Sequence, residues 1–208
     1  MQPGGGKREV DEAVSKREAI LAAAGEVFFE RGYEATTTLD IATKAKTSKR
    51  ALYQHFPSKE AILAELIRSR SRQMQAPVEI PPPKSRSAFF DTLRTFGVVF
   101  LSQLLQPNTI ALYRLAIGEA GRSAQIGHEL KLSGQGPVVE AVRRLMEHGA
   151  GQGFLRRDDI DLAVDAFFHV LIGPLQIGLL LRTEKQPSRS TLRLRADRAI
   201  AVLQHLST

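Results

Sequence analysis

Four cations within seven residues mark the part of the chain best suited to bind phosphate. Lys44, Lys46, Lys49 and Arg50 lie close together, and no Asp or Glu stands among them. Lysine and arginine neutralise phosphate oxygens, and the net charge of +7 favours an anionic partner, nucleic acid first and a membrane surface second. A solvated basic helix end in a small bundle would carry the same residues, so the cluster alone leaves both interpretations open.

The residues around this cluster predict two short helices joined by a tight turn. Thr37 can cap the first helix together with Asp40, three residues later, in the pattern of a capping box. Ser48 can cap the second helix, and Pro57 would stop it. Three of the four cations then lie in the turn or at the start of the second helix, where the helix dipole disfavours positive charge. A helix that enters the major groove with its first residues leading needs such an arrangement.

This stretch resembles the DNA-binding domain of the TetR family of bacterial transcriptional regulators. The match runs from about residue 17 to residue 66 and contains Phe28-Phe29 before Gly32-Tyr33, the threonines before Asp40-Ile41-Ala42, and the run LYQHFPSKE at residues 52–60. A looser resemblance to one C-terminal subgroup of the family covers much of residues 111–182, including YRLAIGEA at 113–120 and the Gly136-Pro137 pair.

The resemblance implies an all-α fold and a regulatory function. The expected architecture is a three-helix helix-turn-helix DNA-binding domain plus a larger helical ligand-binding and dimerisation domain, about nine or ten helices in total. The expected function is that of a ligand-responsive regulator, more often a repressor, that binds a palindromic double-stranded DNA operator as a homodimer. A small apolar or amphipathic effector, unidentified by the sequence, would release it. No cofactor is implied.

The resemblance also implies which residues contact DNA. The second helix of the motif would enter the major groove, and the turn and the start of this helix would face the bases: Lys46, Thr47, Ser48, Lys49, Arg50 and Ala51. Among them, Lys49 and Arg50 can read guanine O6 and N7, and the methyl group of Ala51 can touch thymine. Four further positions match those that usually hold the phosphate backbone: Thr37, Tyr53, His55 and Lys59.

Each of the four backbone positions also has a plainer interpretation. Thr37 can serve only as a cap, Tyr53 and His55 can simply pack against the first helix of the motif, and Lys59 can lie on the surface. The turn departs from the family pattern, since Lys46-Thr47 stands where Gly and an apolar residue are usual. A left-handed turn costs Lys about 1 kcal/mol more than Gly. Because Arg50 also replaces a frequent Gly, the bases that are read need not follow the family pattern.

A proline-rich run divides the chain into its expected parts. These are a disordered Gly-rich tail at 1–14, the helix-turn-helix domain at 15–75, a stiff extended connector at 76–84, and the ligand-binding and dimerisation domain at 85–208. Apolar periodicity and punctuation predict helices near 15–31, 89–104, 107–119, 123–132, 137–146, 160–181 and 190–205. Asp158 or Asp159 would cap the 160–181 helix, and residues 133–137 would interrupt the chain.

No segment has the properties of a signal peptide or a membrane span. The N-terminal residues contain no apolar region, and the most apolar run, residues 166–181, is shorter than the roughly 20 residues that span a bilayer. We therefore expect a cytoplasmic protein that does not associate with membranes.

The segment from Ile160 to Leu181 is apolar nearly all round, which predicts burial on two sides. We expect this helix and the 137–146 helix to pair with their copies in a four-helix homodimer interface through Val138, Val142, Leu145, Phe167, Leu171 and Leu175. The alternative is that residues 160–181 form the central core helix of a monomer.

Aromatic residues gather in the second half of the chain, where the family holds its ligand. The expected pocket residues are Phe96, Phe100, Tyr113 and Phe168, with His169 as a polar contact. The alternative is that these rings are ordinary core and that His169 is a satisfied core histidine.

The sequence shows no pattern of an enzyme. A nucleophile elbow, a P-loop, a dinucleotide-binding turn and metal-spaced His or Asp pairs are all missing, and there is no cysteine to bind a metal. No catalytic residue and no metal site are therefore predicted. The alternatives to a regulator are a small helical protein that binds nucleic acid non-specifically and a ligand-binding helical enzyme.

Overall fold

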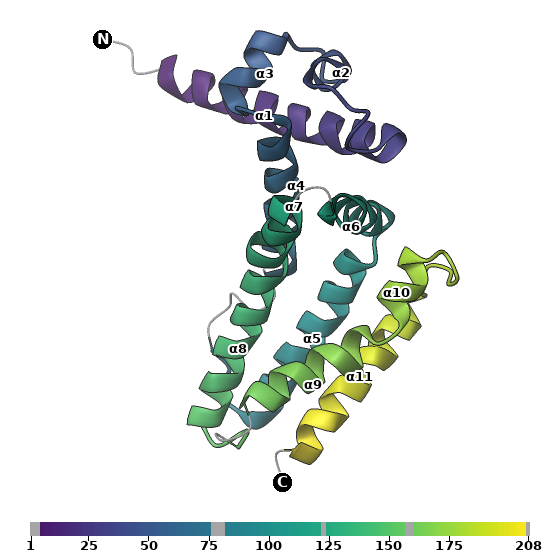
Figure 1. Ribbon diagram of the computed structural model, residues 1–208. Helices are drawn as coiled ribbons and strands as arrows, with labels where there is room; N and C mark the ends of the chain where they lie inside the picture. Colours follow the sequence, from purple (N-terminus) through teal and green to yellow (C-terminus); the bar gives the residue numbers. More distant parts are fainter. Residues whose placement is uncertain (1–4, 76–81, 122–123, 157–159, 207–208) are drawn as a thin grey trace.

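The computed structural model describes residues 5–75, 82–121, 124–156 and 160–206, whose regular structure is entirely helical. In chain order the elements are α1 (Gly5–Arg31), α2 (Thr38–Lys44), α3 (Lys49–His55), α4 (Lys59–Gln75), α5 (Arg86–Leu104), α6 (Pro107–Ala120), α7 (Ala124–Glu129), the π-helical segment η2 (Leu130–Gln135), α8 (Gly136–Gly151), α9 (Ile160–Ile172), α10 (Leu175–Leu180) and α11 (Arg189–Leu206). In Figure 1, α1 to α3 form a head at one end, and α5 to α11 form a longer body that α4 joins to it. The predicted all-α fold is confirmed.

Helix α1 is longer than its sequence pattern indicated. It begins at Gly5 rather than near residue 15, so the prediction of a disordered tail is wrong for residues 5–14, while residues 1–4 lie outside the described part. Most of the residues at 7–13 (KREVDEA) are good helix formers, and extending an existing helix needs no new nucleus. The helix ends at Gly32, whose φ of +81° is the left-handed conformation expected at this position.

The body is organised around α5. The apolar stripe predicted along this helix is buried, since Phe89, Leu93, Phe96, Phe100 and Leu104 are each no more than 5 % exposed. Helices α9 and α11 pack along α5 and each other, and α8 packs on α9 (Figure 1). Full burial of one large apolar side chain contributes about 1.5–3 kcal/mol, so this stripe is a main source of stability.

One glycine permits the close approach of α8 to α5. A Cβ atom added at Gly149 would lie 2.5 Å from Cε2 of Phe89, whereas one added at Gly151 would meet nothing within 4 Å. We expect Gly149→Ala to lower the free energy of unfolding by about 1–3 kcal/mol, because the Phe89 ring is buried and cannot move freely.

Urea denaturation measures this difference. The matched variant Gly151→Ala, in the same helix, should leave stability unchanged or raise it by up to about 1 kcal/mol through better helix propensity. Equal effects of the two substitutions would contradict the close contact with Phe89.

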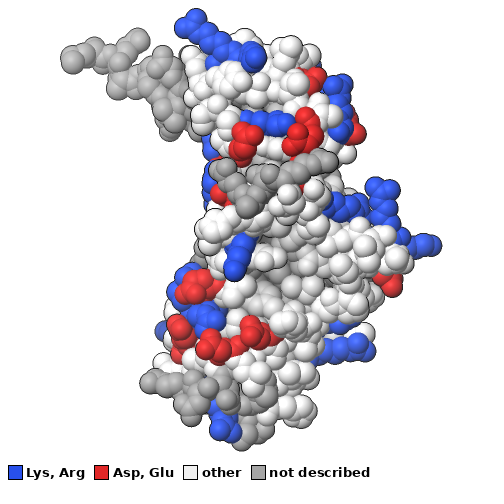
Figure 2. Space-filling model, viewed as in Figure 1, with Lys and Arg blue, Asp and Glu red and all other residues white. Residues whose placement is uncertain are grey.

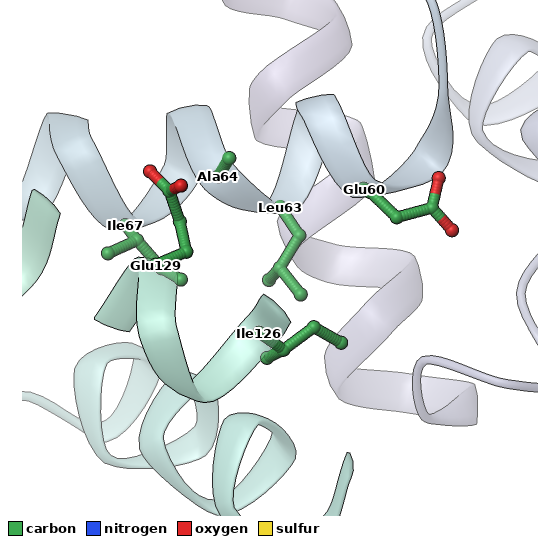
Figure 3. Close-up of a pocket in the computed structure, with 6 residues that line it drawn as sticks. All are labelled: Glu60, Leu63, Ala64, Ile67, Ile126 and Glu129. Carbon is green, nitrogen blue, oxygen red and sulfur yellow. The ribbon is translucent and has the colours of Figure 1, made fainter. Parts of the chain in front are cut away.

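The head and the body share a second core. The sequence-based division of the chain between residues 75 and 85 therefore does not separate two cores. The core of the head includes Leu112 and Ala116 of α6 and Ile126 of α7. Figure 3 shows this junction, where Ile126 of α7 lies beside Leu63 of α4 and encloses with it only a small recess of about 20 Å³. The head therefore packs directly against α6 and α7 as well as α4. The connector at residues 76–81 lies outside the described part.

Two expected boundaries differ in the structure. The long helix predicted at 160–181 is two helices, because Gly173 takes a φ of +49° and Pro174, which has no N–H group to donate, starts the next turn. The predicted break at 133–137 is instead helical, since η2 leads directly into α8. Residues 122–123 and 157–159, with the predicted caps Asp158 and Asp159, lie outside the described residues.

Within the described ranges, no single helix is long and apolar enough to cross a membrane. Helices α5 and α6 are long and apolar enough only when taken together, and the two are bent by 67° relative to each other.

Candidate DNA-binding surface and internal cavity

Helices α2 and α3 form the predicted helix-turn-helix unit with the predicted caps. The Thr37 hydroxyl accepts a hydrogen bond from the Asp40 backbone N–H at 3.1 Å, and the Asp40 carboxylate accepts one from the Thr37 N–H at 2.9 Å. The bonds from Thr37, assisted by the Arg31 guanidinium, lower the pKa of Asp40. The Ser48 hydroxyl caps α3 by accepting from the Ala51 N–H at 3.1 Å. The cap predictions for Thr37 and Ser48 are confirmed.

The turn between the two helices places Lys46 in the left-handed region, with a φ of 51°. The next residue, Thr47, closes the turn by donating its N–H to the Ala42 carbonyl at 2.9 Å. A residue with a Cβ atom is strained in this conformation, and the side chain of Lys46 is exposed.

We expect Lys46→Gly to raise the free energy of unfolding by about 1 kcal/mol, because glycine adopts positive φ without strain. Urea denaturation of the wild type and variant measures the gain. Lys46→Ala removes the same charge but keeps the Cβ atom, so it should give no such gain. Equal stabilisation by both substitutions would assign the effect to charge and not to φ.

The cations of the motif divide into one that is paired and three that are not. The Lys44 ammonium lies 2.9 Å from a Glu26 carboxylate oxygen and 3.6 Å from one of Glu30, both on α1. Lys46, Lys49 and Arg50 are exposed, and no ion pair to an acid is found for them among the described residues. Figure 2 shows Lys and Arg side chains projecting from this end of the molecule. Three unpaired cations around the start of α3 form a surface suited to phosphate.

The four residues predicted to hold the DNA backbone lie in different settings. The Tyr53 ring is 45 % exposed, and its hydroxyl lies 3.1 Å from the Thr38 hydroxyl, next to the Thr37 cap. His55 is half-buried at the end of α3. The Lys59 ammonium donates to the Tyr33 carbonyl at 2.8 Å, so it is directed at the loop after α1. Tyr53 and Thr38 thus present hydroxyls side by side, while the Thr37 hydroxyl is engaged with Asp40.

A buried carboxylate joins the head to the body. Glu65 of α4 is 7 % exposed, and its carboxylate pairs with Arg17 of α1 at 3.1 Å, Arg68 at 3.1 Å and Arg72 at 2.8 Å. Arg68 also pairs with Glu129 of α7 at 2.9 Å. Burial raises the pKa of Glu65, but the bonds from the three arginines outweigh burial and lower the pKa to about 2. The network links α1, α4 and α7 by charge, beside the apolar contact between α4 and α7 that Figure 3 shows.

A cavity of about 370 Å³ opens in the body between α5, α6, η2, α8, α9 and α10. Four of the five residues predicted for a pocket line it: Phe100, Tyr113, Phe168 and His169. The fifth, Phe96, is fully buried and instead stacks on Phe100, with ring centroids 5.4 Å apart. Small-molecule sites have volumes of roughly 300–1,000 Å³, so the cavity can hold a ligand.

The sequence did not indicate most of the polar residues of the cavity. Gln135, Asp165 and Gln176 line it together with His169. Gln176 reaches the cavity because the chain turns at Gly173, and Gln135 does so because η2 continues the helix that was expected to end. No local pattern in the sequence carries this information.

The residues predicted for a dimer interface lie inside the chain's own core. Val138, Val142, Leu145, Phe167 and Leu171 are at most 8 % exposed, and Leu175 is partly buried against the same core. Their helices are amphipathic, and the faces named from the sequence point inward. A partner chain would have to use residues other than the five buried ones, which corrects the prediction for them, while Leu175 stays a prediction.

No group of three or more His, Asp or Glu side chains is placed to hold a metal ion within the described ranges.

Both halves of the chain match known families, in line with this geometry. Residues 20–66 match the bacterial regulatory proteins of the tetR family, and residues 91–205 match the C-terminal domain of AefR-like transcriptional repressors. The HTH-type transcriptional regulator YdeS of Bacillus subtilis is 26 % identical over 175 residues, which are 84 % of this chain and 82 % of that protein.

Solved structures agree over nearly the whole length. A TetR transcriptional regulator from Agrobacterium tumefaciens has 29 % identity and a TM-score of 0.77, with 92 % of this chain and 93 % of that chain covered. The flavonoid-responsive regulator FrrA has 25 % identity and a TM-score of 0.73, with 92 % and 96 % covered.

The fold and the cationic helix-turn-helix define a DNA-binding transcriptional regulator. The matches to both halves are more specific: this chain belongs to the TetR family.

Proposed function

We propose that this protein is a cytoplasmic repressor that binds a palindromic operator as a homodimer and is released by a small apolar or amphipathic effector. The unpaired cations Lys46, Lys49 and Arg50 around the start of α3 carry the DNA-binding part of the proposal. The cavity in the body supports the effector part, and the name of FrrA supports a small aromatic effector.

The cavity lies directly against the helix that carries the head. Gly134 of η2 lines the cavity, and a Cβ atom at this position would lie 3.2 Å from Cγ2 of Ile67 on α4. Ile67 belongs to the core shared with the head. A ligand that binds better when η2 and α4 have shifted would move the two heads of a dimer out of register with the operator, and so lower DNA affinity.

The dimer contact is proposed on the outer face of α9 and α11, which pack side by side. This face exposes large apolar side chains, since Leu162 is 54 % and Leu194 is 50 % exposed. Both helices bury their opposite faces against α5. Covering these side chains with a second copy would remove apolar surface from water and place two α3 helices on one duplex, about 34–36 Å apart.

We expect Leu162→Glu with Leu194→Glu to weaken dimerisation by at least about tenfold, because four buried apolar contacts per dimer are replaced by charges of one sign. Analytical ultracentrifugation over a concentration series measures the dissociation constant. Leu132→Glu, at a side chain 57 % exposed on η2, is the matched control and should leave the dimer intact. A variant that stays as dimeric as the wild type would place the interface elsewhere.

The test of the whole function is selection from a randomised DNA duplex pool at about 0.15 M salt, where non-specific binding is weak. An enriched inverted repeat supports specific dimeric recognition. Retention without enrichment would contradict it in favour of non-specific binding to phosphate, and no retention would contradict DNA binding itself.

A further inference from the structure

The inner wall of the cavity is aromatic and rigid. The Phe100 and Phe168 rings meet edge to face with centroids 5.5 Å apart, and Phe96 packs behind both at 5.4 and 6.2 Å. Leu104, Val138, Val139 and Ile172 complete the apolar lining. A flat ring system placed against these faces gains both apolar burial and aromatic contact.

The outer part of the cavity offers mainly hydrogen-bond acceptors. The Asp165 carboxylate can only accept when ionised. The Nδ1 atom of His169 lies 2.7 Å from the Asp165 backbone carbonyl, which cannot donate, so Nδ1 carries the proton and donates it. In the neutral ring, Nε2 of His169 is then an acceptor. A ligand must bring hydroxyl or amine donors to this rim.

The inner polar groups are uncharged. Burial raises the pKa of Tyr113, and interactions with the Gln135 and Gln176 side chains lower it by less, so the phenol keeps its proton at neutral pH. The two amides and the phenol can each exchange hydrogen bonds with hydroxyl groups.

Among the residues that the structure describes, no lysine or arginine lines the cavity. A carboxylate or phosphate inside it would lose its water without gaining a cation. A cationic ligand would find only the Asp165 carboxylate, which is exposed, and ion pairs in water contribute little. The cavity therefore disfavours anions and gives cations little advantage.

We propose that the effector is an uncharged planar aromatic compound with hydroxyl donors, whose rings lie against Phe100 and Phe168 and whose hydroxyls reach His169, Asp165 and the two glutamines. This inference rests on the proposed function, since it names the ligand of the same cavity. The acceptor-rich rim selects for the hydroxyl groups, and the absence of a cation selects against fatty acids and acyl phosphates.

Calorimetric titration of the full-length protein tests the class. The probes are dihydroxybiphenyl and trihydroxystilbene, their methyl ethers, dodecanoate, and phenyltrimethylammonium. We expect a hydroxylated probe to bind and its methyl ether to bind at least about tenfold more weakly, because methylation removes the donors and leaves the acceptors unsatisfied. Tighter binding of dodecanoate or of the cation, equal binding of the methyl ethers, or no binding of either hydroxylated probe would overturn the proposal.

Variants locate the bound probe. His169→Leu and Gln176→Leu should each weaken binding of the hydroxylated probe by about 3- to 30-fold, because each variant loses a hydrogen bond to the probe. Binding of the methyl ether should change little. Gln204→Leu, exposed on α11, is the control and should change neither. If both variants bind the hydroxylated probe as tightly as the wild type does, the hydroxyl groups of the probe lie elsewhere and the assignment is overturned.

DNA binding separates the two proposals. If dodecanoate releases the protein from its operator and the hydroxylated probes do not, the proposed effector class is wrong and the regulatory function stands. If a hydroxylated probe binds in the cavity and leaves operator affinity unchanged, the class stands and effector-controlled release is wrong.

Discussion

Replacing Lys49 and Arg50 together by alanine is expected to weaken operator binding by at least about 30-fold, because each contact to a base edge contributes about 1–3 kcal/mol. Both side chains are exposed near the N-terminus of α3, and neither is engaged by an acid in the described part of the chain. The loss should appear in fluorescence anisotropy with the selected duplex. The slope of log affinity against log salt should fall by up to about 2 if both residues also neutralise phosphates.

Two control variants separate recognition from charge. Lys84→Ala with Lys185→Ala removes the same charge from exposed positions of the body outside α3, α9 and α11, and should change affinity only slightly. Lys44→Ala removes a cation of the motif that is already paired with Glu26 and Glu30. Its effect on affinity should therefore be smaller than that of the double variant in α3. An affinity that depends only on net charge would refute the assignment of α3 as the recognition helix.

Glu65→Gln is expected to lower the free energy of unfolding by about 2–3 kcal/mol at neutral pH. Its carboxylate is the shared acceptor of Arg17, Arg68 and Arg72, and removing the charge leaves three guanidinium groups without their anion. The arginines are 40–62 % exposed, so water stabilises them in part, and we place the loss at the lower end of the range for buried pairs. Urea denaturation measures the change.

The same carboxylate gives stability a defined dependence on pH. The pKa of Glu65 is about 2 in the folded chain, against 4.5 for an unperturbed glutamate, so its contribution is complete above pH 4.5 and is lost as the pH falls towards 2. The wild type should therefore approach the stability of Glu65→Gln as the pH decreases through this window. Glu140→Gln, at an exposed pair with Arg143 and Arg144, should change stability by less than about 0.5 kcal/mol. A constant gap between wild type and Glu65→Gln from neutral pH down to about pH 3 would contradict the lowered pKa.

The local signals of the sequence determined the helix-turn-helix unit. Thr37, Ser48 and Gly32 act through bonds and dihedral angles within a few residues, so their roles as caps and helix end follow from residue type and spacing alone. The stripe along α5 was equally readable, because helical periodicity places apolar residues on one face whatever that face meets. The cation cluster was also visible, since charge at the start of a helix is a property of the sequence.

Only the tertiary structure decided which face of each helix is turned inward and which residues meet. Phe96 and Phe100 look alike in the sequence, yet one is core and the other lines the cavity, because their place depends on α9 packing across α5. The same holds for Phe167 and Leu171, which are buried in this chain's core and not on its surface. Burial is set by contacts between residues far apart in the chain. The periodicity of one helix carries no information about these contacts.

The cavity rim and the link from the cavity to the head depend most on tertiary structure. Gln176 and His169 face one space only because the chain turns at Gly173, and Gly134 meets Ile67 only because η2 packs on α4. The Arg17–Glu65–Arg68–Glu129 network likewise joins three helices. The sequence by itself therefore determined the family, the fold class and the cationic helix-turn-helix unit, where the interactions are local. The lining of the cavity and its contact with α4, on which the proposed ligand chemistry and coupling rest, came from long-range packing, which no short pattern encodes.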